Sequence, residues 1–411
     1  MAESAGRDGA VDRSEGFGER LLGQLLDRAH EMPPQLIAPL VAEEVRGIGG
    51  RDVAILLQDY SQLTLVSLPG WGLTSREPMP LEGSPAGEAF LSESVIEHRQ
   101  DGGVQMFLPL LDGSDQIGVM SLTLDNVDDD DRRLLRRLAG LVAELIVTKD
   151  RFTDQFFQAR RREAMTVSAE IQWSLLPPLT MTTPQVAVAG ILEPAYDIAG
   201  DSMDYALNDD ILHMAMVDAM GHGLNAAVLA TVAIGAYRHA RRADSGLAEL
   251  YAFMDKAIDE QFGPDHFTTA QMMRLNVTTG DLRWVNAGHH APLLIRGDRV
   301  HTTLEGHGTL PVGIGATPQI NTRQLRPGDR VLAYTDGLIE EHTPGGEQFG
   351  VERLIDVIER VAPTCGTVQH MVRRLSHTLK RERGEITTDD ASIFLVEWRG
   401  DTTEHLAVPL P

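Results

Sequence analysis

The chain has 411 residues, 42% of them apolar, a length typical of two or three domains. Its 36 basic and 60 acidic residues give a formal net charge of −24, which argues against nucleic acid as a partner. One cysteine, Cys365, excludes a disulfide framework and a cysteine-based zinc site. No apolar run approaches the length of about 18 residues needed to span a membrane, so no membrane partner is expected. Residues 1–19 are polar and lack the apolar centre of a signal peptide, so we expect a disordered tail and a cytoplasmic protein.

Residues 20–147 mix helical and strand patterns and are assigned to one domain. Apolar residues recur at helical spacing from Leu21 and again from Ile37. The acidic run 128–131 is expected to place favourable charge at the start of a helix. Four short apolar runs predict strands, and the turn DGSD between the last two predicts a hairpin; the runs are 53–59, 63–68, 104–111 and 116–124.

A helical linker is predicted over residues 148–170. A row of positions at alternating steps of four and three enters it from the preceding domain, which is the spacing of a heptad seam. The row consists of Leu138, Val142, Leu145, Lys149, Phe152, Phe156 and Ala159. We expect a continuous helix and a homodimer formed through it and through the first domain. The alternative is an amphipathic helix that packs on its own domain.

Residues 171–400 form a second domain with many strands and few helices, followed by a tail over 401–411. Two buried runs, 211–218 and 329–336, each end on an aspartate, and 224–242 is alanine-rich and helical. Further helices are predicted over 351–362 and 367–382. This order favours a layered α+β sandwich over a regular βαβ fold.

Four acidic motifs stand at the ends of apolar runs or in glycine-rich turns of this domain. Clustered carboxylate oxygens suit hard divalent cations, and carboxylates brought together repel one another without a cation between them. The alternative is four ordinary surface turns, because aspartate and glycine favour turns. The motifs are AGDSMD (199–204), VDAMGHG (217–223), YTDGLIE (334–340) and TTDDAS (387–392).

The order and wording of these motifs resemble the PPM family of metal-dependent protein phosphatases, in its SpoIIE/RsbU-like branch. Further segments continue the likeness, namely EIQWSLLPP, RWVNAGHHAPLLI, LPVGIG and RPGDRVLAYTDGLIE. The resemblance implies an αββα sandwich with a site for two Mn2+ or Mg2+ ions at one edge.

The resemblance also implies roles for individual residues. Asp218 would bridge both ions, assisted by the carbonyl of Ala219, while Asp336 and Asp389 would bind one of them. Asp201 would lie in the inner or outer coordination sphere of the other ion. Asp218, Asp336 and Asp389 are therefore the expected catalytic residues. Further candidates are Asp390 and Asp204 as ligands, with Gly200, Gly221 and Gly337 as flanking glycines and His222 as either a general acid or a histidine that orients the turn. His289 and His290 are expected to shape a loop.

Residues 20–147 resemble a GAF domain, a small sensor module of α/β structure. The likeness rests on AGEAFLSESVIEH (86–98), FLPLL, IGVMSLTL and the helix LLRRLAGLVAEL. The ligand of such a sensor and the direction of its effect do not follow from the residues.

Together these resemblances imply a phosphoserine or phosphothreonine protein phosphatase under the control of a sensor. Its substrate would be a regulatory phosphoprotein, and the branch suggests an anti-sigma-factor antagonist. Two alternatives stay open at this point. One is a hydrolase of small phosphate esters or nucleotides, and the other is a signalling scaffold without catalysis.

Overall fold

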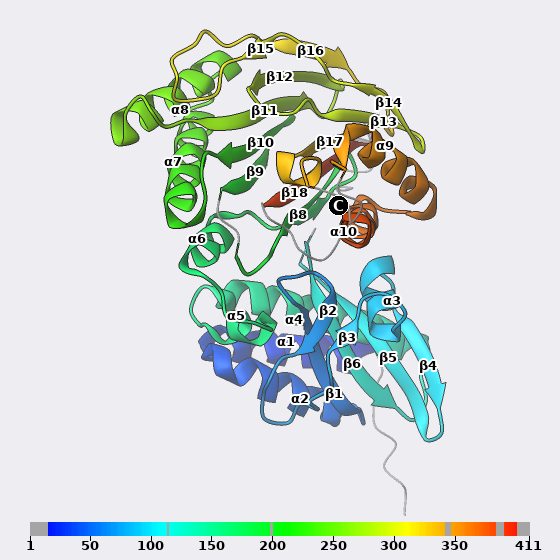
Figure 1. The fold of residues 1–411 in the computed structure, drawn as a ribbon. Helices are drawn as coiled ribbons and strands as arrows, with labels where there is room; N and C mark the ends of the chain where they lie inside the picture. Colours follow the sequence, from blue (N-terminus) through cyan, green and yellow to red (C-terminus); the bar gives the residue numbers. More distant parts are fainter. Residues whose placement is uncertain (1–14, 113–114, 198–199, 342–346, 384–389, 401–411) are drawn as a thin grey trace, which may run out of the picture. The chain divides into compact units, whose positions relative to one another are not determined.

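A computed structural model describes residues 15–112, 115–197, 200–341, 347–383 and 390–400 (Figure 1). The chain divides into two compact units, with the boundary between Arg162 and Glu163. This boundary falls inside the range 148–170 that was predicted as a linker.

The first unit is built on one antiparallel sheet with strand order β3-β2-β1-β6-β5-β4. The predicted hairpin is confirmed, because β5 and β6 pair up to Asp112 and Asp115. The elements are α1 (Glu15–Glu31), η1 (Pro34–Leu36), α2 (Ile37–Gly47), β1 (Arg51–Gln58), β2 (Thr64–Ser67), β3 (Met79–Pro80), α3 (Pro85–Ser92), β4 (Ile96–Gln100), β5 (Gly103–Asp112), β6 (Asp115–Leu124), α4 (Asp129–Asp150) and α5 (Gln155–Arg160).

Alternation along β1 decides which helices cover which face of this sheet. Ile55 and Leu57 point into a core shared with α1, α2 and α4, while Ala54 and Leu56 point into a smaller core shared with α3. Asp128 caps α4 in a reciprocal capping box with Asp131, so the predicted acidic helix start is confirmed. The helix α1 already begins at Glu15, so the prediction of a tail is wrong for residues 15–19. The remainder of both predicted tails lies outside the described residues.

The prediction of one continuous linker helix is wrong. Helix α4 ends at Asp150, α5 is a separate short helix, and the next helix begins at Val167. Leu138, Val142, Leu145 and Phe156 are buried in the core of the first unit, whereas Phe152 is 76% exposed. The heptad spacing therefore records an amphipathic segment that packs on its own domain, and these four residues are not available as a dimer seam.

The second unit contains two six-stranded sheets. One has the order β15-β12-β11-β10-β9 with β16 beside β12, and the other has the order β14-β13-β17-β18-β8-β7. The elements are α6 (Val167–Leu175), β7 (Thr180–Thr182), β8 (Val186–Glu193), β9 (Asp201–Asn208), β10 (Ile211–Ala219), α7 (Gly223–Arg242), α8 (Leu247–Phe262), β11 (Thr268–Asn276), β12 (Asp281–Ala287), β13 (Leu293–Arg296), β14 (Arg299–Thr303), β15 (Gly308–Thr309), β16 (Asn321–Gln324), β17 (Arg330–Tyr334), η2 (Asp336–Leu338), α9 (Gly350–Val361), η3 (Ala362–Thr364), α10 (Val368–Arg383) and β18 (Ala391–Trp398).

The predicted αββα sandwich is confirmed by the burial of alternate residues. Met214 and Met216 of β10 face a core between the two sheets, together with Phe394 of β18. Ala215 and Val217 point the other way, into a core with α7 and α8. Helices α9 and α10 cover the outer face of the second sheet (Figure 1). The apolar core between the two sheets thus packs them face to face. Polar side chains lie at the ends of the strands.

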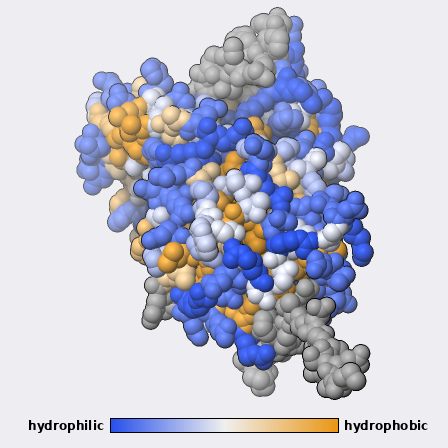
Figure 2. All heavy atoms as spheres, turned by 90° about the horizontal axis from the view of Figure 1, so that it is seen from below, coloured by the Kyte–Doolittle hydropathy of each residue, from blue (hydrophilic) through white to orange (hydrophobic). Residues whose placement is uncertain are grey.

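No helix in the described ranges combines the length and apolarity needed to cross a bilayer. On the face shown in Figure 2, hydrophilic residues predominate and hydrophobic residues occur in several separate areas. Scattered exposed apolar side chains of this kind are ordinary for a folded domain.

Candidate metal centre

Acidic residues from both sheets meet at one end of the sandwich. Asp201 begins β9 and stands directly opposite Asp218 near the end of β10. Asp390 immediately precedes β18, and Asp336 follows β17 in the short helix η2. Like charges placed opposite each other on neighbouring strands repel. The sequence prediction that these motifs converge is therefore right for the residues that the structure describes.

Asp201 is the most deeply buried of these carboxylates, at 2% exposure. Its Oδ2 atom accepts hydrogen bonds of 2.6 Å from the hydroxyls of Thr335 and Ser392, which belong to the opposite sheet. Burial raises the pKa of Asp201 well above its ordinary range, and the charges of Asp218 and Asp390 raise it further. The two hydroxyls favour the ionised form and oppose this shift. A cation beside Asp201 would relieve the repulsion.

Asp390 holds the backbone of the turn before β9. Its Oδ2 atom accepts a hydrogen bond of 2.7 Å from the amide of Gly200 and a longer one of 3.4 Å from the amide of Asp201. One carboxylate oxygen is therefore used to fix the turn. This contact places Asp390 beside Asp201, as a positioning residue for that carboxylate.

Asp336 is half-buried, and its pKa is raised by burial and then by the nearby charge of Glu340. His290 opposes this shift, so Glu340 and His290 both lie close to Asp336. The ring of His290 also stacks on Tyr334, with centroids 5.9 Å apart. Sequence reasoning gave neither residue a place here, although Glu340 follows Asp336 by four positions in the same motif.

Thr269 and His289 support Asp218 from the neighbouring strand. Thr269 is the register partner of Asp218, and its hydroxyl lies 3.4 Å from Oδ2 of that carboxylate. The same hydroxyl lies 2.8 Å from Nδ1 of His289. Burial, followed by the charge of His290, lowers the pKa of His289 to about 3, so its ring is neutral near pH 7. His289 was expected to shape a loop, and Thr269 was not predicted because no turn or motif marks it in the sequence.

Asp204 is not placed as a metal ligand, and that candidate assignment is wrong. Its buried carboxylate accepts hydrogen bonds from Arg238 of α7, at 3.0 and 2.7 Å, and from Arg241, at 2.5 Å. Arg238 also donates to the carbonyl of Leu175 at the end of α6. Asp204 therefore neutralises two arginines and ties α7 to β9 and α6.

Backbone geometry explains two of the glycines around the centre. A Cβ atom on Gly337 would lie 2.0 Å from the carbonyl oxygen of Asp390, so only glycine lets η2 approach the start of β18 this closely. Gly221 has a φ of 89°, which favours glycine in the turn after Asp218. A Cβ on Gly200 would lie 2.7 Å from the carbonyl oxygen of Ala219, so that carbonyl faces the same turn. His222 is exposed at the start of α7 and makes no capping hydrogen bond with its side chain.

The donor atoms fit a hard divalent cation. Carboxylate oxygens, such as those of Asp201, Asp218 and Asp336, are the ligands that these cations prefer. Burial raises the pKa of Asp201 first, and the charges of Asp218 and Asp390 raise it further, so a nearby cation would favour its ionised form. Within the described ranges, no three histidine, cysteine or acidic side chains gather closely enough to hold an ion by themselves. Asp389, the remaining expected ligand, lies outside those ranges.

The second unit is similar in sequence to known proteins. Residues 208–399 match the family described as Stage II sporulation protein E (SpoIIE). The chain is similar to protein IcfG of Synechocystis sp., at 23% identity over 223 residues, which cover 46% of this chain and 34% of IcfG. It is also similar to phosphoserine phosphatase RsbU of Bacillus subtilis, at 19% identity over 246 residues, which cover 58% of this chain and 71% of RsbU. The chain thus spans about a third of the first relative and most of the second.

Two solved structures also align with part of this chain. The SiaA-PP2C domain of Pseudomonas aeruginosa aligns with a TM-score of 0.49 and 22% identity, covering 57% of this chain and 94% of that domain. The RsbU and RsbW domains of Rv1364c from Mycobacterium tuberculosis align with a TM-score of 0.47 and 26% identity, covering 53% of this chain and 63% of that protein.

Proposed function

We propose that this chain, whose residues 208–399 match the SpoIIE family, is a metal-dependent phosphatase of PP2C type that acts on phosphoserine or phosphothreonine of a regulatory protein. The observation that carries the proposal is the meeting of Asp201, Asp218 and Asp390 at one end of the two sheets. The short helix η2, which begins at Asp336, packs through Gly337 against the backbone of Asp390. The matching relative RsbU is named a phosphoserine phosphatase, which supports the choice of substrate class.

We carry the metal ligands over from the family resemblance. Asp218 and the carbonyl of Ala219 would hold two ions of Mn2+ or Mg2+, and Asp336 with Asp389 would complete one of the sites. When bound, such ions act as Lewis acids that lower the pKa of water and offset negative charge on the phosphoryl group. Asp201 would serve the other ion, held in place by the hydroxyls of Thr335 and Ser392.

The chain's own residues prepare the site for this chemistry. Thr335 and Ser392 fix Asp201 from the opposite sheet, and Thr269 restrains Asp218. Ligands fixed in advance by hydrogen bonds lose little freedom when they bind an ion, which favours affinity and geometry. Asp218 is half-buried, so its carboxylate remains partly accessible to solvent.

The finer assignments extend this proposal. The substrate would be a phosphorylated anti-sigma-factor antagonist, and the first unit would act as a GAF-like sensor. The six-stranded antiparallel sheet with helices on both faces supports the sensor assignment. We further propose that the protein is cytoplasmic.

Self-association is proposed through a different surface from the buried heptad row. Trp71 is 79% exposed and Phe152 is 76% exposed. Their segments are adjacent, because Gln155 donates a hydrogen bond of 3.1 Å to the carbonyl of Pro69. Light scattering of the wild type and of the variant Trp71→Asp/Phe152→Asp tests this surface. A monomeric wild type at tens of micromolar would refute the proposal.

The decisive experiment measures phosphate release from a phosphoserine protein or peptide with and without Mn2+. Asp218→Asn should lower turnover at saturating Mn2+ by more than tenfold, which corresponds to about 1.4 kcal/mol of barrier. Asp209→Asn is a matched control, because it removes the same charge from the turn at the far end of the same hairpin. No Mn2+-dependent release by the wild type, or equal loss in both variants, would refute the proposed function.

A further inference from the structure

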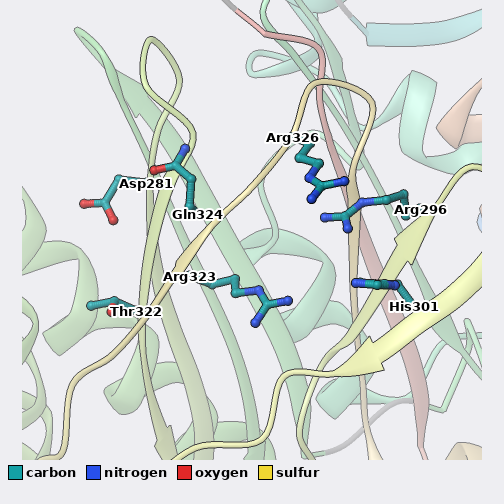
Figure 3. Close-up of a pocket in the computed structure, with 7 residues that line it drawn as sticks. All are labelled: Asp281, Arg296, His301, Thr322, Arg323, Gln324 and Arg326. Carbon is teal, nitrogen blue, oxygen red and sulfur yellow. The ribbon is translucent and has the colours of Figure 1, made fainter.

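A second polar hollow lies at the opposite end of the sandwich from the candidate metal centre. Its volume is about 510 Å3, and Asp281, Arg296, His301, Thr322, Arg323, Gln324 and Arg326 line it (Figure 3). Asp281 pairs with Gln324, and the neighbouring register pairs run to Ile211, the end of β10 remote from Asp218. The hollow is thus separate from the candidate metal centre.

One wall of this hollow is built on a buried ion pair. Arg296 donates two hydrogen bonds of 2.7 Å to the two carboxylate oxygens of Asp329, which is 1% exposed. The backbone amide of Arg326 donates a third, of 2.8 Å, to the same carboxylate. Burial alone would raise the pKa of Asp329, but these hydrogen bonds hold it below the ordinary value. Such a two-point contact fixes the plane of the Arg296 guanidinium and leaves its remaining edge toward the hollow.

Cationic side chains converge on this fixed wall. Figure 3 shows the ends of Arg296, Arg323, Arg326 and His301 directed toward one space, while Asp281 and Thr322 lie on its far side. In the described part of the chain, neither Arg323 nor Arg326 forms an ion pair. Asp281 is engaged with Arg283 at 2.8 Å, so it does not neutralise them. Arg326 is close enough to Asp329 for its charge to lower the pKa of that carboxyl, but Arg296 already holds both oxygens of the carboxylate. The guanidiniums of Arg323 and Arg326 therefore stay available to an anion, in a chain whose formal net charge is −24.

We propose that this hollow binds a phosphate group, either free or as the end group of a small phosphorylated molecule. Arginine guanidiniums match phosphate oxygens with paired N–H donors, and several around one space offset a doubly charged anion. The amide of Gln324 already donates to the carbonyls of Thr279 and Leu325, so the arginines and His301 supply the donors. The volume lies within the range of about 300–1,000 Å3 found for small-molecule sites. The inference is independent of the proposed phosphatase activity, because none of the lining residues belongs to the metal centre.

The test is calorimetric titration of inorganic phosphate and of glycerol 3-phosphate into the full chain, freed of metal by chelation and dialysis. Without metal, the carboxylates at the other end repel anions, so saturable binding of one equivalent reports on the basic hollow. Binding should weaken as ionic strength rises. Arg323→Gln/Arg326→Gln should lower the affinity by at least tenfold. Both residues are exposed, so the fold should persist, which circular dichroism verifies.

A control variant with the same change in charge distinguishes a specific phosphate site from nonspecific electrostatic attraction. Arg242→Gln/Lys256→Gln removes two positive charges from α7 and α8 and should change the affinity by less than twofold. Asp218→Asn should leave it unchanged, whatever that variant does to catalysis. The proposal is overturned if neither probe binds saturably, or if the control loses as much affinity as the test variant. It is equally overturned if Arg323→Gln/Arg326→Gln impairs action on a phosphoprotein although neither probe binds, since the hollow would then receive an acidic protein surface.

Discussion

The hydroxyl of Thr269 lies 2.8 Å from Nδ1 of His289. The same oxygen faces Asp218 at 3.4 Å, so it can accept from the histidine and donate to the carboxylate. A neutral His289 suits this order, and burial keeps its ring neutral. The pair therefore restrains the carboxylate that we assign as the bridging ligand, although neither residue would touch a metal.

Replacing this hydroxyl should weaken metal binding. Thr269→Val keeps the shape of the side chain but removes the donor to Asp218, and we expect Mn2+ affinity to fall by about tenfold to a hundredfold, as for other residues that orient ligands. Thr269→Ser restores the hydroxyl and should recover most of the affinity. Titration of Mn2+ by calorimetry measures both variants without reference to activity. Equal Mn2+ affinity in the valine and serine variants would show that the hydroxyl has no such part.

Asp201 should make the metal-free protein less stable as the pH rises. Burial and the neighbouring carboxylates raise the folded-state pKa of Asp201 above that of the unfolded chain. Its contribution to stability is therefore complete below the unfolded pKa, about 3.9, and is lost as the pH rises through the folded value. Asp201→Asn removes this dependence, so metal-free Asp201→Asn should melt at a higher temperature than metal-free wild type at pH 8, with a smaller difference at pH 5.

The same melting experiment with added Mn2+ tests the proposed role of the ion. The ion offsets the repulsion in the wild type, so Mn2+ should raise the melting temperature of the wild type more than that of Asp201→Asn. Asp209→Asn, in the exposed turn of the same hairpin, should follow the wild type in both conditions. If Asp201→Asn melts below the wild type at every pH, burial and charge repulsion at Asp201 do not destabilise the metal-free protein.

Replacing Asp204 should lower the free energy of unfolding but leave the affinity for Mn2+ unchanged. Asp204→Asn leaves Arg238 and the buried Arg241 without their carboxylate, and removal of one partner from a buried ionic network costs about 3–5 kcal/mol. Urea unfolding should show a loss of this size, while Mn2+ affinity of the folded variant stays within about twofold of wild type. A large loss of Mn2+ affinity with unchanged stability would instead restore Asp204 as a ligand.

Gly337 should be intolerant of even a methyl group. Gly337→Ala places a Cβ atom 2.0 Å from the carbonyl oxygen of Asp390, so η2 or the start of β18 must move, and the carboxylates of Asp336 and Asp390 move with them. We expect lower Mn2+ affinity and a destabilisation of a few kcal/mol, as for other overpacked positions. Gly366→Ala is the matched control, because no atom lies within 4 Å of its Cβ and its φ is not positive. Equal melting temperatures for the two variants would contradict this account.

Sequence reasoning predicted the parts of the fold that depend on local pattern. Buried runs ending on Asp218 and Asp336 marked strands, and the acidic motifs marked the edge where the sheets meet. It failed where a residue's partner is distant in the chain. Asp204 occurs in the same motif as Asp201, but its partners Arg238 and Arg241 are 34 and 37 residues away on α7, and no local pattern predicts that they turn toward it. Thr269 lies within a strand, and no sequence motif predicts that its hydroxyl contacts Asp218.

The predicted dimer seam through the heptad positions was wrong for a different reason. Leu138, Val142 and Leu145 have the spacing of a coiled-coil seam, but the same spacing also describes one helix packed on a sheet. Only the buried positions of these residues against the sheet of the first unit decide between the two.

The two hydroxyls that hold Asp201 have a consequence for biosynthesis. They belong to Thr335 and Ser392, which follow Asp201 by 134 and 191 residues. A nascent chain that has not yet produced β18 has made Asp201 and Asp218 but lacks Ser392 and the strand beside it. Contacts of such long sequence separation also slow folding. The candidate metal centre is therefore complete only after the last strand of the sandwich has left the ribosome, and a chain that stops short would carry its acidic residues without the Ser392 hydroxyl that positions Asp201.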